Sequence, residues 1–483
     1  MTNLSGANLN NGAAVGPQGE GRDSPSTFPK YPAYKDSGVE WLGVVPENWK
    51  VSGIKFFTDL ITGITPPSDD LDNYAEEGWP WVRPEDLNDS AKPVLASKFL
   101  TDQGWRFCRK VKRGSTLICC IGTIGKIGFV DSDVCTNQQI TAVVPRGNGK
   151  FFFYAMQALK PAFDVSATGN VLRILNSERL GNVTMAVPDH GEAESIARFL
   201  DHETARIDAL IEEQQRLIEL LKEKRQAVIS HAVTKGLDPT VPMKDSGVEW
   251  LGEVPAHWVL KRIKHVTLSF DQGWSPQCEN QPVEDDMQPG VLKTGCVNGG
   301  IFRSDENKRL PDDLELVSSL TVHAGDLLVS RANTRELVGS AAVPTVSYPN
   351  LMISDKIFRV RVMKKEANSR FLAFYLGSPF ARREIELSAT GASSSMLNIS
   401  QSAIADMLFP CPPVLDQERI VRHIVEETYR LLALAEQALR LKELLQERRS
   451  ALISAAVTGK IDVRGWQPPA STQAPEPAVA EAV

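Results

Sequence analysis

Apolar residues recur at helical spacing in two long stretches of the chain, which end near residues 236 and 459. Steps of three and four residues with charged flanks are typical of a helix that buries one stripe against a partner helix. The predicted stripe comprises Ile207, Leu210, Gln214, Leu217, Leu221 and Val228, and then Leu431, Leu434, Ala438, Leu441, Leu445 and Leu452. At about 1.5 Å per residue, each helix would be about 60 Å long. Gly236 and Gly459 are expected to stop the helices at their C-terminal caps.

The two stretches belong to a larger internal repeat. The segment KDSGVEWLGVVPENW, starting at Lys35, returns as KDSGVEWLGEVPAHW at Lys244, with three of fifteen positions changed. The helical stretch that starts at Ile196 aligns without a gap on the one that starts at Ile420. The offsets are 209 and 224 residues, so the segment between the motifs is 15 residues longer in the second copy. A period of this length indicates two domain-sized copies and excludes a solenoid of short repeats.

Neither long helix can bury its apolar stripe alone. Because both stripes lie in one chain at equivalent places, we predict that the helices pair within the chain and run antiparallel. Such pairing would place the two globular segments at opposite ends of a rigid spacer. Two alternatives stay open at this point, namely helices that belong to separate bundles and a coiled coil between two copies of the chain.

The globular segments indicate a mixed α/β fold. Short apolar runs at 117–120, 127–130, 140–144, 327–330 and 357–362 predict strands, and 151–159 and 371–378 predict helices. The expected fold class is two α/β domains separated by two long antiparallel helices, which form an intramolecular coiled coil with a pseudo-twofold internal repeat. The expected segments are a disordered tail (1–29), a domain (30–190), a helix (191–236), a domain (237–412), a helix (413–462) and a disordered tail (463–483).

Composition narrows the class of protein. Hydrophobic residues make up 42% of the chain and charged residues 23%, as in ordinary globular proteins. No apolar run approaches the roughly 20 residues that span a bilayer, and the N-terminus lacks the pattern of a secretory signal. The seven cysteines form no CxxC pair, which favours reduced thiols. We therefore expect a cytoplasmic protein.

Catalytic motifs are missing from the sequence. GTIGK at Gly122 lacks the upstream glycine and the following Ser or Thr of a phosphate-binding loop. There is no GxSxG, no HExxH and no His/Cys cluster with metal-ligand spacing. These absences disfavour a stand-alone nuclease or methyltransferase, and we expect a chain that is not an enzyme and holds no metal.

Candidate DNA contacts occur in both globular segments. The net charge of −7 disfavours nucleic acid, but local clusters of basic residues suit phosphate contacts. The first cluster comprises Arg106, Arg109, Lys110, Lys112 and Arg113, and the second comprises Lys356, Arg359, Arg361, Lys364 and Lys365. Candidates for base readout are Asn137, Gln138, Gln139, Arg331, Asn333, Thr334 and Arg335. Polar loops that follow SATG at Ser166 and Ser388 add Thr168, Asn170, Ser393 and Ser394. Solvated charged faces and ordinary loop hydrogen bonds are the alternative interpretation of each set.

Taken in order, these motifs resemble the specificity (S) subunit of type I restriction–modification systems. The resemblance rests on the duplicated SGVEWLGxVPxxW segment, on the segments that lead into the long helices at Pro188 and Pro412, and on the helix ends AVTKGLD and AVTGKID. It covers residues 30 to 463, approximately the whole chain apart from its tails.

The resemblance implies two target recognition domains, each of which reads one half of an asymmetric bipartite DNA sequence, with the paired helices setting the spacing. It also implies docking of two methyltransferase (M) subunits and, in the full complex, of restriction (R) subunits. S-adenosylmethionine, ATP and Mg²⁺ would then be bound by those partners, with no cofactor on this chain. The alternative is a non-catalytic coiled-coil scaffold for protein interactions, which footprinting on DNA would exclude.

Overall fold

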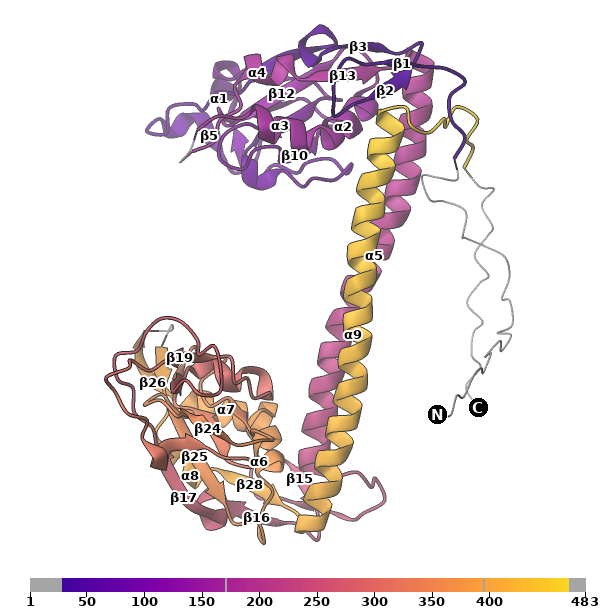
Figure 1. Ribbon diagram of the computed structural model, residues 1–483. Coiled ribbons are helices and arrows are strands. Elements are labelled where there is room, and N and C mark those ends of the chain that lie inside the picture. The colour runs from indigo at the N-terminus through magenta and orange to yellow at the C-terminus, as the bar shows by residue number, and fades with distance from the viewer. Residues whose placement is uncertain (1–27, 170–171, 394–395, 469–483) are drawn as a thin grey trace, which may run out of the picture. The chain divides into compact units, whose positions relative to one another are not determined.

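The computed structural model describes residues 28–169, 172–393 and 396–468 (Figure 1). The chain forms two compact units, each of which has its own core. Unit 1 comprises residues 1–214 and 440–483, and unit 2 comprises residues 215–439. The long helices α5 (His190–Lys235) and α9 (Val414–Val457) each have residues in both ranges. Each unit therefore contains one globular domain and part of both helices.

The domain of unit 1 is built on two small sheets. The first has the strand order β10-β9-β12-β4 and is antiparallel, and the second has the order β5-β7-β6-β11-β8, in which β6 and β11 run parallel. The first sheet comprises β4 (Thr58–Thr62), β9 (Thr116–Cys119), β10 (Ile127–Phe129) and β12 (Ile140–Pro145). The second comprises β5 (Tyr74–Ala75), β6 (Trp79–Val82), β7 (Phe99–Leu100), β8 (Lys110–Val111) and β11 (Val134–Thr136). The pairs β1 (Tyr34–Asp36) with β2 (Val44–Pro46) and β3 (Lys50–Gly53) with β13 (Thr184–Val187) complete the strands of this unit.

The first sheet of unit 1 is covered on both faces. Ile118 and Val143 point to the face that packs against α2 (Gly149–Ala158). Leu117 and Ala142 point to the opposite face, which packs against the second sheet. Because successive residues of a strand alternate between faces, a strand covered on both sides is apolar throughout, as the sequence shows here. The remaining helices of this domain are α1 (Asp102–Phe107), α3 (Lys160–Ser166) and α4 (Ser177–Asn182).

Unit 2 repeats the two sheets of unit 1, except that its second sheet has no counterpart of β5. Its sheets are β23-β21-β25-β17 and β19-β18-β24-β20, and β18 and β24 run parallel. The bounds are β17 (Thr267–Gln272), β18 (Gly290–Leu292), β19 (Asn307–Arg309), β20 (Thr321–Val322), β21 (Leu327–Ser330), β23 (Ala341–Ala342), β24 (Tyr348–Met352) and β25 (Ile357–Val362). The other strands are β14 (Met243–Asp245), β15 (Glu253–Pro255), β16 (Val259–Arg262), β22 (Ala332–Asn333), β26 (Thr390–Ser393), β27 (Met396–Asn398) and β28 (Leu408–Cys411). The helices are α6 (Ser369–Leu376), α7 (Pro379–Ser388) and α8 (Gln401–Asp406). The predicted strands correspond to β9, β10, β12, β21 and β25, and the predicted short helices to α2 and α6.

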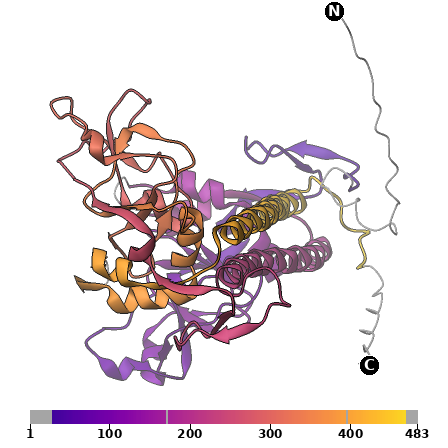
Figure 2. The ribbon, with the colours of Figure 1, turned by 90° about the horizontal axis from the view of Figure 1, so that it is seen from below.

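The two long helices pack on each other antiparallel. In unit 1 the beginning of α5 meets the end of α9: Ile207 and Leu452 share one core, and Arg449 Nε lies 2.7 Å from Asp208 Oδ1. In unit 2 the end of α5 meets the beginning of α9, where Ile229 and Ile424 share a core. Figures 1 and 2 both show the helices side by side. The predicted intramolecular pairing is confirmed, and each helix contributes to both units.

The buried stripe of these helices differs from the predicted one. Ile207, Leu221, Leu431, Ala438, Leu445 and Leu452 are buried, and Gln214 and Val228 are half-buried. Leu210, Leu217, Leu434 and Leu441 are 38–50% exposed and lie beside the helix contact. The next residue in each case, Ile211, Ile218, Ala435 or Lys442, is more buried. On three of these four turns, the predicted residue and the residue after it are both apolar. Spacing alone therefore does not show which of the two faces the partner helix.

The ends of the ordered chain also differ from the prediction. The second helix ends at Val457, before residue 462. Val463 is buried, and the Trp466 ring lies 5.3 Å from that of Phe199. The Asp462 N–H donates to the carbonyl of Pro29 at 2.7 Å, which ties the two chain ends of unit 1 together. Phe28, Val463 and Trp466 of the predicted tails therefore pack against unit 1, and residues 1–27 and 469–483 lie outside the described residues.

Candidate nucleic-acid interface

Four loops of unit 1 meet at the ends of β4, β9 and β11. We call them loop cluster 1, which comprises residues 63–66, 120–124, 137–139 and 172–175. The amide of Gly63 donates to the carbonyl of Ile140 and that of Ile64 to Thr136, each at 3.0 Å. The amide of Cys120 donates to Gln139, and the amide of Leu175 donates to Cys120, each at 2.8 Å. The loops are thus held together by their backbones.

Loop cluster 2 in unit 2 has the same backbone frame and comprises residues 273–276, 331–335, 354–356 and 396–399. The amide of Gly273 donates to Ile357 at 3.4 Å and that of Trp274 to Ile353 at 3.1 Å. The amide of Arg331 donates to Lys356 at 2.8 Å, and the amide of Ile399 donates to Arg331 at 2.9 Å. Matching these bonds makes three positions equivalent between the units, namely Cys120 with Arg331, Gln138 with Asp355 and Gln139 with Lys356.

A glycine is required at the same place in both clusters. A Cβ on Gly63 would lie 2.2 Å from the carbonyl oxygen of Asn137, and a Cβ on Gly273 would lie 2.0 Å from that of Ile353. Real Cβ atoms do not approach backbone this closely, so only glycine lets these loops touch. The close approach explains why Gly-x-Thr-Pro at Gly63 returns as Gly-x-Ser-Pro at Gly273.

The three predicted base-reading residues of unit 1 lie in loop cluster 1, but their side chains differ in burial and in hydrogen bonding. Asn137 is buried, and its Nδ2 donates to Gln139 Oε1 at 2.9 Å. The Thr65 hydroxyl donates to Oε1 of Gln138. Gln139 is half-buried and, among the described residues, its Nε2 has no hydrogen-bond partner. Gln138 and Gln139 each accept one hydrogen bond on Oε1, and within the described residues neither Nε2 has a partner, so both amides can donate to a ligand.

The predicted residues of unit 2 also come together. Arg331 Nη1 donates to the carbonyl of Asp355 at 3.1 Å, and the Ser275 hydroxyl donates to the Asp355 carboxylate. Lys356 is exposed, and no hydrogen bond or ion pair of its ammonium occurs within the described part of the chain. Arg335 is exposed as well. Asn333 belongs to β22, and its Nδ2 donates to Asn298 at 3.3 Å, so this amide serves the fold.

The two loop clusters differ in side-chain charge at the equivalent positions Cys120 and Arg331. Burial raises the pKa of the Cys120 thiol to about 11, so this side chain is uncharged at neutral pH. Arg331 brings a positive charge to the same position in unit 2. The two clusters thus share a backbone and present different chemistry.

The first basic cluster lies next to loop cluster 1. Its members are all exposed, namely Arg106, Arg109, Lys110, Lys112 and Arg113. Arg109 Nη1 donates to the carbonyl of Thr62 at 3.1 Å, directly before Gly63. Lys110 lies over the Trp105 ring at 5.7 Å, and Lys112 pairs with Asp133 at 3.0 Å. An exposed basic cluster beside polar loops suits phosphate contacts.

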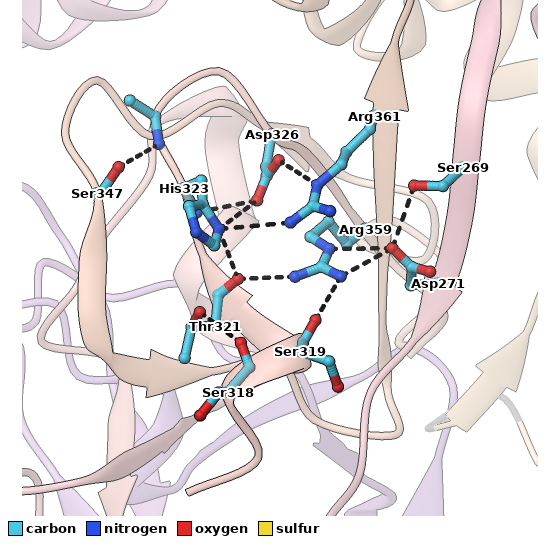
Figure 3. Close-up of polar contacts among 11 residues, drawn as sticks. Ser269, Asp271, Ser318, Ser319, Thr321, His323, Asp326, Ser347, Arg359 and Arg361 are labelled. Carbon is cyan, nitrogen blue, oxygen red and sulfur yellow. Dashed lines mark hydrogen bonds and ion pairs between the residues drawn. The ribbon is translucent and has the colours of Figure 1, made fainter.

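Two arginines of the second basic cluster, Arg359 and Arg361, contact polar groups of unit 2 (Figure 3). Arg359 is buried and binds the Asp271 carboxylate at 2.8 Å and the carbonyls of Ser319 and Thr321. Arg361 lies 3.4 Å from Asp326 and 3.4 Å from the His323 ring. Lys356, Lys364 and Lys365 are exposed. Arg359 is therefore occupied by contacts within unit 2, and the other four residues stay predicted phosphate contacts.

The loops after SATG are only partly described. Thr168 is exposed and exchanges two backbone hydrogen bonds with Ile174. Asn170 and Ser394 lie outside the described residues, and Ser393 ends β26 with a side chain that is not described. The sequence pairs Leu175-Asn176 with Leu397-Asn398. In the structure, Asn176 caps α4 and Ser400 caps α8. Asn176 is therefore equivalent to Ser400, two residues after Asn398.

Sequence reasoning missed three residues of these clusters, namely Thr65, Ser275 and Trp274. Trp274 is 41% exposed at the position that holds Ile64 in unit 1. The sequence does contain a signal for these residues, because Gly-x-Thr/Ser-Pro follows β4 in unit 1 and β17 in unit 2. A match of three residues within segments that otherwise differ is too short to be identified as a repeat from sequence alone.

Within the described part of the chain, no group of three His, Cys, Asp or Glu side chains could hold a metal ion. None of the helices in the same residues is both long and apolar enough to cross a membrane.

The chain is similar to proteins of one family. A family model described as the type I restriction modification DNA specificity domain matches residues 46–221. The EcoEI specificity subunit of Escherichia coli is 29% identical over 213 residues, which cover 44% of this chain and only 36% of that subunit. The EcoKI specificity subunit of Escherichia coli strain K12 is 23% identical over 398 residues, which cover 79% of this chain and 82% of that protein.

The fold agrees with the sequence matches. A chain solved in work on complex assembly and conformational transition of the type I R-M system superposes with a TM-score of 0.64. The match covers 86% of this chain and 98% of the other at 14% identity, so it bears on the fold alone. The chain is thus similar over most of its length to type I restriction–modification specificity (HsdS) subunits, and residues 46–221 match the DNA specificity domain of that family.

Proposed function

We propose that each unit reads one half of an asymmetric, bipartite DNA target and that loop clusters 1 and 2 make the base contacts. The observation that carries the proposal is the shared backbone frame with different side chains at equivalent positions. A common frame presents side chains to a groove in the same way, and different side chains then select different base pairs.

Three side chains are suited to base readout. Gln139 in unit 1 offers an amide, which matches the donor and acceptor groups of adenine in the major groove. Lys356 and Arg331 in unit 2 offer donors that match the two acceptors of guanine. Thr168, Asn170, Asn333, Arg335, Ser393 and Ser394 remain predicted contacts in the surrounding loops.

Phosphate contacts in unit 1 would come from the first basic cluster. Because Lys and Arg release counterions when they bind phosphates, substitutions there weaken binding to all sequences and reduce its salt dependence. This localised charge reconciles DNA binding with a net charge of −7.

We further propose that two methyltransferase subunits dock along α5 and α9, and that restriction subunits join them in the full complex. Exposed leucines on the helices support this assignment, because runs of exposed apolar side chains mark interaction surfaces. They include Leu210, Leu441 and Leu444 in unit 1 and Leu217, Leu220, Leu432 and Leu434 in unit 2. S-adenosylmethionine, ATP and Mg²⁺ would be bound by these partners.

Exchange of one recognition domain tests the proposal. Residues 50–190 are replaced by the corresponding segment of another specificity subunit, and the chain is co-expressed with its methyltransferase partner. Methylated adenines are then mapped across a genome. We expect one half-site to change and the other half-site to stay the same. Changes in both halves would refute independent reading, and methylation without any sequence preference would refute a role in specificity.

A further inference from the structure

In each unit a single hydroxyl ties the Gly-x-Thr/Ser-Pro loop to the neighbouring loop. In unit 1 the Thr65 hydroxyl donates to Oε1 of Gln138. In unit 2 the Ser275 hydroxyl donates to Oδ1 of Asp355, and the Asp355 amide donates back to Ser275 Oγ at 3.1 Å. We call these contacts the hydroxyl latches. Their acceptors differ chemically, yet they occupy equivalent positions and make the same kind of contact.

The backbone holds each hydroxyl in place for this contact. Gly63 and Gly273 press the loop onto its neighbour, as the Cβ distances show. Pro66 and Pro276 follow the hydroxyl residues directly. A proline restricts the preceding residue to extended conformations, so Thr65 and Ser275 have few alternative orientations. The latch is therefore preorganised by the chain itself.

The residue after each acceptor is the one we propose to read bases. Gln139 follows Gln138, and Lys356 follows Asp355. Backbone bonds of 2.8 Å from Cys120 and Arg331 fix the carbonyls of these two residues. In unit 1, Asn137 also holds Gln139 through its side chain. In each unit, contacts hold both the preceding residue and the carbonyl of Gln139 or Lys356. These contacts limit the orientations that the Gln139 and Lys356 side chains can adopt.

We infer that the latches Thr65–Gln138 and Ser275–Asp355 are positioning devices that orient Gln139 and Lys356 toward the DNA bases. The inference rests on the proposed function, because it assumes that these loops contact DNA. A loop ordered before binding loses less conformational entropy in the complex. Loss of a latch therefore weakens discrimination in its own half-site only.

The test uses the chain in complex with its methyltransferase subunits and a DNA duplex that carries the mapped target. Discrimination is the ratio of dissociation constants for that duplex and for one with a single base pair changed in one half-site. Thr65→Val removes the hydroxyl at nearly constant volume and should lower discrimination in the first half-site about fivefold to tenfold, as loss of one hydrogen bond allows. Ser275→Ala should do the same in the second half-site.

Conservative variants and a nearby control separate positioning from general damage. Thr65→Ser and Ser275→Thr keep the hydroxyl and should retain discrimination. Thr62→Val removes a hydroxyl that meets Thr141 at 3.1 Å in the adjoining strand, and it should leave both half-sites unchanged. If Thr65→Val fails to fold, Gln138→Leu removes the same contact from the other loop and must give the same result.

A double substitution adds a test of the contact itself. Thr65→Val combined with Gln138→Leu should be no worse than Gln138→Leu alone, since both remove one interaction. The inference is overturned by additive effects, by equal losses at both half-sites, or by unchanged discrimination in Thr65→Val. A wild-type complex that shows no discrimination at all would instead refute the proposed function, so the two failures are distinguishable.

Discussion

At the scale of single residues, burial and ion pairing determine which basic side chains are accessible to a ligand. Arg359 lies in a basic run of the sequence, yet it is buried and bound to Asp271 and two carbonyls. A buried charge without partners is costly, so these contacts are structural requirements. Arg106 and Arg113 lie in a similar run and are exposed. Burial therefore distinguishes Arg359 from the arginines of the first cluster, although the two runs are alike in composition.

A glycine at the end of α9 supplies a prediction at this scale. Gly459 has a φ of +70°, and a Cβ there would lie 2.2 Å from Pro46 Cδ. Gly459→Ala is expected to destabilise unit 1 by about 2–4 kcal/mol, from backbone strain and from the clash. Urea unfolding followed by circular dichroism measures the change.

Gly38 is the matched control for Gly459. It has the same φ of +70°, but a Cβ there would meet no atom within 4 Å. Gly38→Ala should cost only the backbone term, about 1 kcal/mol. Equal losses in the two variants would show that the contact of Gly459 with Pro46 contributes nothing.

At the scale of elements, the long helices combine two apolar faces. One face forms the helix contact and contributes to the cores of both units. The other carries exposed leucines such as Leu434 and Leu441. A helix that binds only one partner needs a single apolar stripe, so the second face is consistent with further partners.

Two leucines of α9, one turn apart, distinguish the two faces. Leu431 is 6% exposed and Leu434 is 50% exposed. Leu431→Ala should lower the free energy of unfolding by about 2–4 kcal/mol, because it leaves a cavity in the helix contact. Leu434→Ala should change it by less than about 0.5 kcal/mol. Thermal unfolding checks both values, and similar losses would contradict the assigned seam.

At the scale of the whole molecule, duplication gives one chain two domains with a common framework, each with a loop cluster that we propose reads bases. The strand orders of the two units match apart from β5, while Cys120, Gln138 and Gln139 are replaced by Arg331, Asp355 and Lys356. The framework is retained because core packing and loop contacts constrain it. The side chains of the loops differ on that common framework.

Lengthening both helices tests their proposed role as a spacer. Seven residues inserted after Gln214 in α5 and after Leu439 in α9 preserve the heptad phase and add about 10 Å, or about three base pairs. Mapping of methylated adenines should show a longer non-specific spacer with both half-sites unchanged. Altered bases within a half-site would show that the helices do not act as a ruler.

Much of the candidate site could be predicted, although its internal order could not. The sequence pointed to Asn137, Gln138 and Gln139 as a group, because polar amides in a loop suit base readout. It could not show that Gln138 is held by another side chain, since that contact joins segments far apart in the chain. Thr65 contacts Gln138 across 73 residues. Only the folded chain brings them together.

The sequence by itself determined the duplication and the two long helices and indicated the family resemblance, because periodicity and repeated motifs are properties of a linear chain. It predicted that the helices pair within the chain but left two alternatives open. The tertiary structure decided which face of each helix forms the seam, which arginines are buried, and which loop residues are equivalent in the two units. These features depend on contacts between distant segments, whose geometry follows from packing and burial and is not encoded in spacing.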